Sequence, residues 1–465
     1  MANSIANSDS VITLSATQLR QYTDEHLQDI ERYFDPSAVL LTDATHQAKA
    51  RRVANTLEAP IIDSSEPDAI ELEQVTLITA PQLDDAYTLL NRDYETPISV
   101  VSSFIEQEYD PNTFETRLTG LSEYQELVRG RSDISTHLTT TMSAGRTVEQ
   151  ADIPLYGAGF IQSLEGSSIP CITLGKTPHV EELDSSKVGI QAIPDIGRKM
   201  RQQLERHGCT DRRDILQMDP TELLELDGFG PYYAARVTTG ASAIEEEKPL
   251  RFVPDPLANE RRVYVDIETD SLSPQYIWQI GVYDDAQDQY HYFINDDEPG
   301  AEAGVVEEFA DWVAANADNA TFIAWYGKQF DFVHLTDFIN SHAPKQHRNA
   351  WEDATKFDLL LDLVKSGVAT PARSHKLDVV ADRLGYEREY PGLSGEQAAQ
   401  AYAEWAAGGD MNWDMWISYC KDDVIAMKYV YDSISDAEMY INKQELEQAY
   451  NRSSSSFNLD SWDGS

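Results

Sequence analysis

The pattern of hydrophobic and polar residues in the second half of the chain shows three successive short runs rich in β-forming residues. They read RRVYVDIE (261–268), YIWQIGVYD (276–284) and QYHYFIN (289–295). Short runs of this composition are typical of strands, so they predict three strands. The short intervals between them favour an antiparallel meander. Helical segments and a further strand, TFIAWY (321–326), follow, and we therefore expect a mixed α/β domain over residues 259–440.

The first third of the chain shows short apolar runs in alternation with helical patterns. The apolar runs are AVLLT, QVTLITA and PISVV, and the helical patterns between them are HQAKARRVANTL and DDAYTLLNR. This order predicts an α/β domain over residues 1–185. Residues 186–245 are expected to be all-α, 246–258 to be a proline-containing linker, and the serine-rich 441–465 to be a disordered tail.

The strand predicted at 261–268 ends in two acids, Asp266 and Glu268, which stand on one face. A solvated strand end is one interpretation, and a site that holds a cation is the other. Two more acids support the second: Asp331 in FIAWYGKQFDF, and Asp423 in WISYCKDDVIAMKYVY, where Tyr419 lies one helical turn before it. Four converging carboxylates would need hard cations such as Mg²⁺ or Mn²⁺, and two such ions can support phosphodiester cleavage.

These motifs resemble those of the DEDD (DnaQ-like) 3′–5′ exonucleases, which have the ribonuclease H-like fold. VDIETD is similar to the first motif, AWYGKQFDF to the second and YCKDD to the third, and SHKLDVVADRLG resembles a segment of family B DNA polymerase proofreading domains. Ser418 stands where one subtype has histidine, so the tyrosine subtype is indicated, with Tyr419 positioning the attacking water. The resemblance implies two divalent ions, held by Asp266, Glu268, Asp331 and Asp423.

Some residues near these motifs have simpler interpretations. Asp422 could be mistaken for the motif acid, but one helical step turns it about 100° away from the Tyr419 face. Tyr326 replaces an asparagine that many relatives have, which puts substrate contacts near the scissile end in doubt. Lys328 is expected to be an exposed loop lysine. His334 and His375 are expected to be ordinary surface or core residues.

Two glycine-containing segments, AIPDIGRKMRQQLERHG and LLELDGFGPYYAARV, resemble a tandem pair of helix-hairpin-helix elements. In that family, glycines allow the tight turn and amides at the next helix N-terminus bind a DNA phosphate. The resemblance implies DNA contacts at Gly197, Arg198, Lys199, Gly228 and Gly230. Asp195 replaces the first glycine of the first hairpin and would face the phosphate, so we expect that hairpin to be the weaker contact. A purely protein-binding role is the alternative.

The domain order also resembles predicted RecB-like nucleases, in which a restriction-type nuclease domain comes first. Such a nuclease needs an acid-x-lysine signature, and no lysine occurs between Lys49 and Lys176. We therefore assign no activity to residues 1–185.

Charge and cysteine content indicate the conditions in which the protein works, and they say little about its chemistry. The formal net charge is −44, and lysine supplies 13 of the 36 basic residues, as in proteins of halophilic organisms. Residues 194–240 are the least acidic region, with seven basic and eight acidic residues. The three cysteines have no metal-ligand spacing, and no apolar run is long enough to span a bilayer. We expect a cytoplasmic protein that binds nucleic acid, without a membrane partner and with unknown protein partners.

The leading hypothesis is a metal-dependent 3′–5′ exonuclease that acts on DNA. A non-catalytic nucleic-acid-binding or repair-scaffold protein is the second hypothesis, and an RNA exonuclease the third. The hairpin pair favours DNA over RNA because such pairs usually bind duplex DNA.

Overall fold

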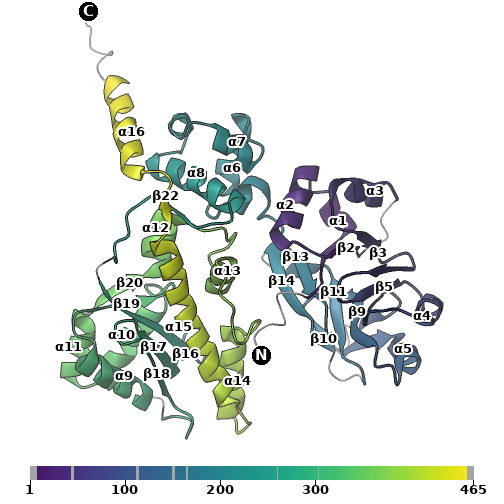
Figure 1. The fold of residues 1–465 in the computed structure, drawn as a ribbon. Coiled ribbons are helices and arrows are strands. Elements are labelled where there is room, and N and C mark those ends of the chain that lie inside the picture. Colours follow the sequence, from purple (N-terminus) through teal and green to yellow (C-terminus); the bar gives the residue numbers. More distant parts are fainter. Residues whose placement is uncertain are drawn as a thin grey trace, which may run out of the picture. The chain divides into compact units, whose positions relative to one another are not determined.

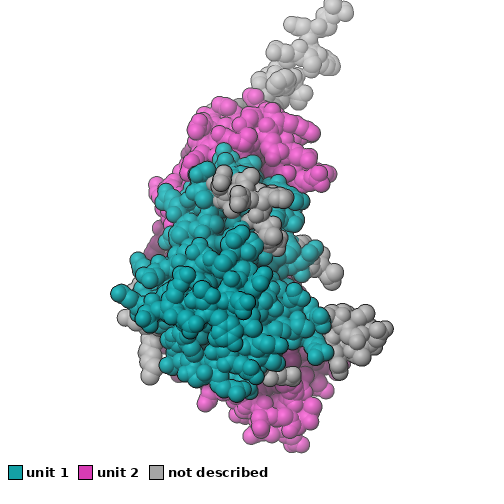
Figure 2. Space-filling view, turned by 90° about the vertical axis from the view of Figure 1, so that its right-hand side faces the viewer, with its two compact units in different colours: residues 1–189 teal, residues 190–465 magenta. Residues whose placement is uncertain are grey.

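The computed structural model divides the chain into two compact units, residues 1–189 and residues 190–465 (Figures 1 and 2). It describes residues 8–42, 47–110, 115–148, 152–163, 166–258, 260–301 and 303–457. The division lies close to the boundary predicted at residue 185. The predicted helical module and the predicted C-terminal domain fall in the same unit.

Two six-stranded sheets form the framework of the first unit. One has the order β12-β13-β1-β2-β3, with β14 paired to β13, and the other has the order β10-β11-β9-β6-β5-β4. The strands of the first sheet are β1 (Ser10–Leu14), β2 (Ala38–Leu41), β3 (Ile61–Asp63), β12 (Ile161–Ser163), β13 (Gly166–Thr173) and β14 (His179–Asp184). Those of the second are β4 (Asp68–Glu71), β5 (Thr76–Ala80), β6 (Ile98–Ser102), β9 (Ile134–Ser143), β10 (Thr147–Val148) and β11 (Leu155–Gly159).

Short helices alternate with these strands, which confirms the predicted α/β character of the N-terminal third. They are α1 (Ala16–Leu19), α2 (Asp24–Phe34), α3 (Gln47–Thr56), α4 (Leu83–Leu90) and α5 (Leu121–Val128), and a separate hairpin is formed by β7 (Glu106–Asp110) and β8 (Glu115–Thr119). The parallel pairs β1–β2 and β5–β6 are each connected through helices. Such crossovers are what parallel pairing requires.

The second unit begins with the predicted all-α segment. It contains a 3₁₀ turn (Gly189–Ala192), α6 (Arg198–Arg206), α7 (Arg212–Gln217), a second 3₁₀ turn (Glu222–Glu225) and α8 (Pro231–Glu245). Apolar side chains from these helices form one core with Phe252 and Leu446. Helix α8 is buried along most of its length because it lies between this core and the remainder of the unit.

The stretch expected to be a linker is part of the fold. Its strand β15 (Leu250–Arg251) pairs antiparallel with β21 (Val368–Ala369) and parallel with β22 (Glu438–Met439). Leu250 is fully buried against Ala243 and Ala369. The prolines and charges that suggested a linker therefore flank a short paired strand.

A five-stranded sheet is the centre of the C-terminal domain, with the order β18-β17-β16-β19-β20. Its strands are β16 (Arg261–Thr269), β17 (Ile277–Asp284), β18 (Gln289–Ile294), β19 (Ala320–Ala324) and β20 (Thr355–Asp358). The first three form the predicted antiparallel meander, and β19 and β20 add in parallel.

Helices cover both faces of this sheet (Figure 1). On one face lie α9 (Ala303–Asn316), α10 (Asp331–His342) and α11 (Lys345–Asp353), and on the other lies the long α15 (Trp413–Ser435). Between β20 and α15 come a π-helical turn (Leu359–Val364), α12 (Lys365–Gly367), α13 (Leu377–Arg383) and α14 (Gly395–Ala406).

The C-terminal segment expected to be disordered begins with a helix, α16 (Lys443–Phe457). Leu446 is buried in the core of the helical module, which explains why this polar stretch is ordered at its start. Residues 458–465 of the predicted tail lie outside the described residues.

Candidate metal-dependent nuclease site

Strand β16 separates its side chains into an apolar set and an acidic set. Val263, Val265 and Ile267 belong to the core under α9 and α10. Asp266 and Glu268 alternate with them and therefore stand on the opposite face, under α15. Glu268 is buried, with 5% exposure. The alternation seen in the sequence thus places both acids at one end of one face.

A glycine in the neighbouring strand lets helix α15 approach these acids closely. Gly281 of β17 is the register partner of Asp266. A Cβ atom at Gly281 would lie 2.7 Å from Cys420 Sγ and 3.2 Å from Val424 Cγ2, both on α15. Any larger residue would have to push the helix away from the sheet.

Three potential ligand groups meet where α15 crosses the strand end. Ligand atoms of Asp266, Glu268 and Cys420 all lie within 4.8 Å of one another, which within the described parts of the chain is the one such group of three. The Cys420 thiol donates to Asp266 Oδ2 across 3.7 Å. Burial, then the charge of Asp266, raises the pKa of this thiol well above its usual range. Cys420 is therefore a neutral donor to the carboxylate, and no pattern in the sequence indicated this contact.

Asp331 and Asp423 lie outside that group of three but act on it electrostatically. Asp331 begins α10 and is 5% exposed. Burial raises the pKa values of Asp266 and Glu268 well above their usual range, and the charges of Asp423 and Asp331 raise them further. Burial likewise raises the pKa of Asp331 to about 7, with contributions from Asp358 and Asp423. The structure thus brings all four predicted acids into one electrostatic cluster.

Tyr419 and Asp423 lie one turn apart on α15, as the helical spacing predicts. Burial raises the pKa of Asp423, whereas Arg388 and a hydrogen bond with the Tyr419 side chain oppose that rise. The Tyr419 ring packs edge-on against Trp416, with ring centroids 5.7 Å apart. This aromatic packing fixes the side chain beside the acids.

Arg388 is a site residue that sequence reasoning missed. Its guanidinium Nη2 donates to Asp423 Oδ1 at 2.6 Å, from the loop between α13 and α14. Asp422 holds that loop, because its carboxylate accepts from the Tyr386 hydroxyl at 2.9 Å and from the Glu389 amide at 2.7 Å. Asp422 therefore points away from the Tyr419 face, as expected. The charged loop YEREYP has no periodicity that could have indicated its partner.

The loop of the second motif departs from an ordinary turn at Tyr326. Tyr326 has φ +62° and a 46% exposed side chain, although left-handed backbone is costly for an aromatic residue. It follows β19, which pairs in parallel with β16 and so ends at the same edge of the sheet as the acids. Lys328 is exposed, as expected, and forms an ion pair with Asp362 at 2.6 Å.

The donor set fits hard divalent cations. Carboxylate oxygens are the ligands that Mg²⁺ and Mn²⁺ prefer, and a cluster of buried acids with raised pKa values is stabilised by added positive charge. Asp266 and Glu268 supply the adjacent pair, and Asp331 and Asp423 flank them from α10 and α15. The cysteine would favour softer ions only as a thiolate, which its raised pKa opposes.

The two glycine hairpins have the same backbone geometry. Gly197 is the N-cap of α6 and Gly230 the N-cap of α8, and neither helix start has a side-chain cap. Gly228 has φ +83°, and Asp195 occupies the equivalent left-handed position with φ +68°. Arg198 and Lys199 are exposed in the first turn of α6.

Asp195 does not face outward as a free carboxylate. Its Oδ2 lies 3.0 Å from His375 Nε2 and 3.3 Å from Arg236 Nη2. These contacts, with Lys365, hold the pKa of Asp195 at about 2 despite its partial burial. Arg236 also donates to two backbone carbonyls near α12. Asp195 therefore ties the first hairpin to the C-terminal domain, and His375 is its partner in that structural contact.

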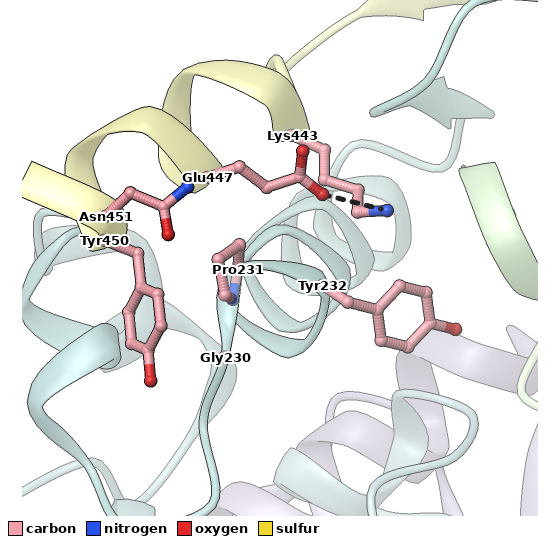
Figure 3. Close-up of a pocket in the computed structure, with 7 residues that line it drawn as sticks. All are labelled: Gly230, Pro231, Tyr232, Lys443, Glu447, Tyr450 and Asn451. Atoms are coloured by element: carbon pink, nitrogen blue, oxygen red, sulfur yellow. Dashed lines mark ion pairs between the residues drawn. The ribbon is translucent and has the colours of Figure 1, made fainter. Parts of the chain in front are cut away.

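The second hairpin is partly covered by α16. A shallow pocket of about 330 Å³ lies at the start of α8 and is lined by Gly230, Pro231, Tyr232, Lys443, Glu447, Tyr450 and Asn451. Figure 3 shows the rings of Tyr232 and Tyr450 on either side of Pro231, below the ion pair of Lys443 with Glu447. The C-terminal helix thus shares the surface that the motif predicts for a phosphate.

Comparison with known proteins agrees with the fold of this region. Residues 263–435 match the family model described as the RNase_H superfamily, and this span is less than half of the chain. One similar solved structure is the family B DNA polymerase from the hyperthermophilic archaeon Pyrobaculum calidifontis. It has 18% sequence identity and a TM-score of 0.29, and the match covers 37% of this chain and 24% of that polymerase chain. No curated protein matches the chain.

The family match and the sheet topology confirm the predicted class, a mixed α/β chain with an RNase H-like domain at its C-terminal end. An RNase H-like domain with a buried acidic cluster indicates a nuclease-type function on nucleic acid. Within the part of the chain that the structure describes, no helix has the length and apolar character to cross a membrane.

Proposed function

We propose that residues 259–440 form a metal-dependent exonuclease that degrades nucleic acid, DNA in the first place, from its 3′ end. The observation that carries this proposal is the electrostatic cluster of four carboxylates from β16, α10 and α15, of which Glu268 and Asp331 are buried and the other two partly buried. Such a cluster costs folding free energy unless cations compensate it. A protein that needed only the fold would be more stable without it.

Each side chain has a defined part in the proposed reaction. Two bound Mg²⁺ or Mn²⁺ ions would supply an activated water and stabilise the departing 3′ oxygen. Asp266 and Glu268 would hold these ions together with Asp331 and Asp423. The hydroxyl of Tyr419, fixed by Asp423 and Trp416, would orient the attacking water. Arg388 would keep Asp423 in position from the opposite side.

The helix-hairpin-helix pair would hold the substrate backbone. The exposed start of α6 combines uncapped amides with Arg198 and Lys199, a combination suited to a phosphate. Contacts of this kind carry no sequence information. Gly228 and Gly230 would add a second contact, which α16 restricts. Nonspecific binding fits an exonuclease, which must move along any sequence.

Degradation of end-labelled substrates tests the activity and its direction. The full-length protein would be incubated in high KCl with 5′-labelled single- and double-stranded DNA and RNA, with Mg²⁺, Mn²⁺ or EDTA. A metal-dependent ladder of shortening labelled strands is expected, whereas immediate release of labelled mononucleotide would indicate the opposite direction. Asp266→Ala is the control for contamination. Absence of products with every substrate would favour a scaffold role, and preference for RNA would favour the RNA exonuclease.

The binding role of the hairpins has a separate test. We expect the double variant Arg198→Glu, Lys199→Glu to weaken binding of duplex DNA in EDTA. Binding that depends on backbone amides loses little with added KCl, so the slope of log affinity against log salt should be shallow. Arg213→Glu, on α7 and paired with Glu245, is the control for the single variant Arg198→Glu, which makes the same change of charge. Equal weakening by the control would argue against a specific site at α6.

A further inference from the structure

Gln279 is a fully buried polar residue whose amide has no partner. It lies in β17 with 0% exposure. Neither Oε1 nor Nε2 has a hydrogen-bond partner within the described part of the chain. A buried amide without partners destabilises a fold, and native proteins rarely keep one. The position of Gln279 should therefore explain why this unpartnered amide is kept.

The strand register places this side chain beside the acids. Gln279 is the partner of Glu268 across the β16–β17 pair, as Gly281 is the partner of Asp266. Directly paired residues share a face, so Gln279 lies on the face of the two carboxylates. It is the next side chain on β17 beyond Gly281, where α15 approaches most closely.

A β-bulge at the end of this strand pair reinforces the arrangement. The register between β16 and β17 shifts after Glu268, because Thr269 pairs with Ile277. Trp278 is therefore the extra residue of β17 and has no register partner on β16. Ile277 joins the core under α9, whereas Trp278 packs with Trp416 and Tyr419. The bulge therefore directs Trp278 and Gln279 to the same face, and bulges of this kind often lie beside active sites.

We propose that Gln279 is a positioning residue of the divalent-metal site, whose amide binds the Glu268 carboxylate and the water ligands of the bound ions. This inference rests on the proposed function and extends it to a residue outside the four acids. Carboxylates that bind a metal are normally held by a second hydrogen-bonding partner. Cys420 serves Asp266 in this way and Arg388 serves Asp423. Gln279 is the neighbour of Glu268 with free hydrogen-bonding capacity.

The proposal predicts opposite effects of one substitution on stability and on metal binding. Gln279→Leu removes the buried amide while it keeps most of the volume. In EDTA the Tm should rise by about 2–4 °C, because the unpartnered group is gone. Affinity for Mn²⁺, measured from the free-ion electron paramagnetic resonance signal in a titration, should fall by about 10- to 100-fold. Substitution of a residue with only a structural role would change the Tm and leave the Mn²⁺ affinity unchanged.

A matched control is available in helix α8. Thr239 is also fully buried, and its hydroxyl likewise has no partner among the described residues. Thr239→Val should raise the Tm in EDTA and leave the Mn²⁺ affinity unchanged. Gln279→Met, which is unbranched, replaces the leucine variant if that variant fails to fold.

The outcomes distinguish this inference from the proposed function. If the wild type binds Mn²⁺ and the Gln279 variants bind it equally well, the role of Gln279 is overturned and the nuclease proposal stands. A wild type that binds no Mn²⁺ would overturn both. Loss of Mn²⁺ affinity in the Gln279 variants, with the control unchanged, would support the positioning role.

Discussion

The two faces of strand β16 have opposite effects on the stability of the fold. On one face Val263, Val265 and Ile267 pack into the core under α9 and α10, where each buried methyl group stabilises the fold. On the other, Asp266 and Glu268 lie under α15 with raised pKa values, which indicates that their charged forms are unfavourable there. Residues one position apart thus differ in whether they contribute stability or reduce it. The acidic face is retained at a cost to stability, and that cost is the physical argument for its function.

The largest expected effect is on the acidic face. Asp266→Asn should lower exonuclease activity by more than about 100-fold, because even partners of metal ligands contribute 10- to 100-fold. The same substitution should raise the Tm in EDTA, because it removes one of several repelling charges. Activity assays and thermal unfolding of one preparation test both. If the Asp266→Asn variant had normal activity or a lower Tm than the wild type, the acidic face would not differ from the apolar face in the way we expect.

Substitution on the apolar face should have the reverse signature. Val282 of β17 lies in the core under α9 and is fully buried, so Val282→Ala should cost about 2 kcal/mol of unfolding free energy. Mn²⁺ affinity at temperatures far below the Tm should be unchanged. Urea unfolding at fixed KCl measures the loss. Tyr292→Ala, on β18 and 49% exposed, should change stability by less than about 0.5 kcal/mol.

Removal of Arg388 should have a smaller effect on the acidic face. Arg388→Gln leaves Asp423 without its guanidinium partner, and we expect about a 10-fold loss of kcat. Arg388→Lys keeps the positive charge and should recover part of the activity. If both variants had wild-type activity, Arg388 would be no more than a charge-neutralising neighbour.

The smallest expected effect is a dependence of metal-free stability on pH. Folding raises the pKa of Asp331 to about 7, so the folded state binds this proton more tightly than the unfolded state. Stability is then highest below the unfolded pKa of about 4 and decreases as the pH rises towards 7. In EDTA the Tm should fall between pH 5 and pH 7, and Asp331→Asn should reduce that fall. Saturating Mn²⁺ should abolish it, since bound cations favour the ionised form.

Much of the C-terminal domain could be predicted because its signals are local. The three β-forming runs in 261–295 predicted the meander, and the i, i+4 spacing of Tyr419 and Asp423 predicted a shared helix face. The partners of these residues could not be found in this way. Arg388, Cys420 and Gln279 belong to an irregular loop, a helix and a strand with no distinguishing pattern, and only packing brings them to the acids.

The helical module shows the same limit. The glycine positions predicted turns before two helices, and α6 and α8 begin at Gly197 and Gly230. The partners of Asp195 come from α8 and from His375, 180 positions further along the chain, so its role as a tie to the C-terminal domain was not visible. The C-terminal stretch looked disordered because it is polar, yet Leu446 anchors α16 in the module core.

The sequence by itself determined the three strands of the meander and the shared helix face of Tyr419 and Asp423, because β-forming runs and helical spacing act over a few residues. Only the tertiary structure decided which groups surround each carboxylate, since those contacts join segments as far as 154 residues apart and depend on how closely α15 can approach Gly281. Burial and proximity, which set the pKa values and the fit to divalent ions, are properties of that packing.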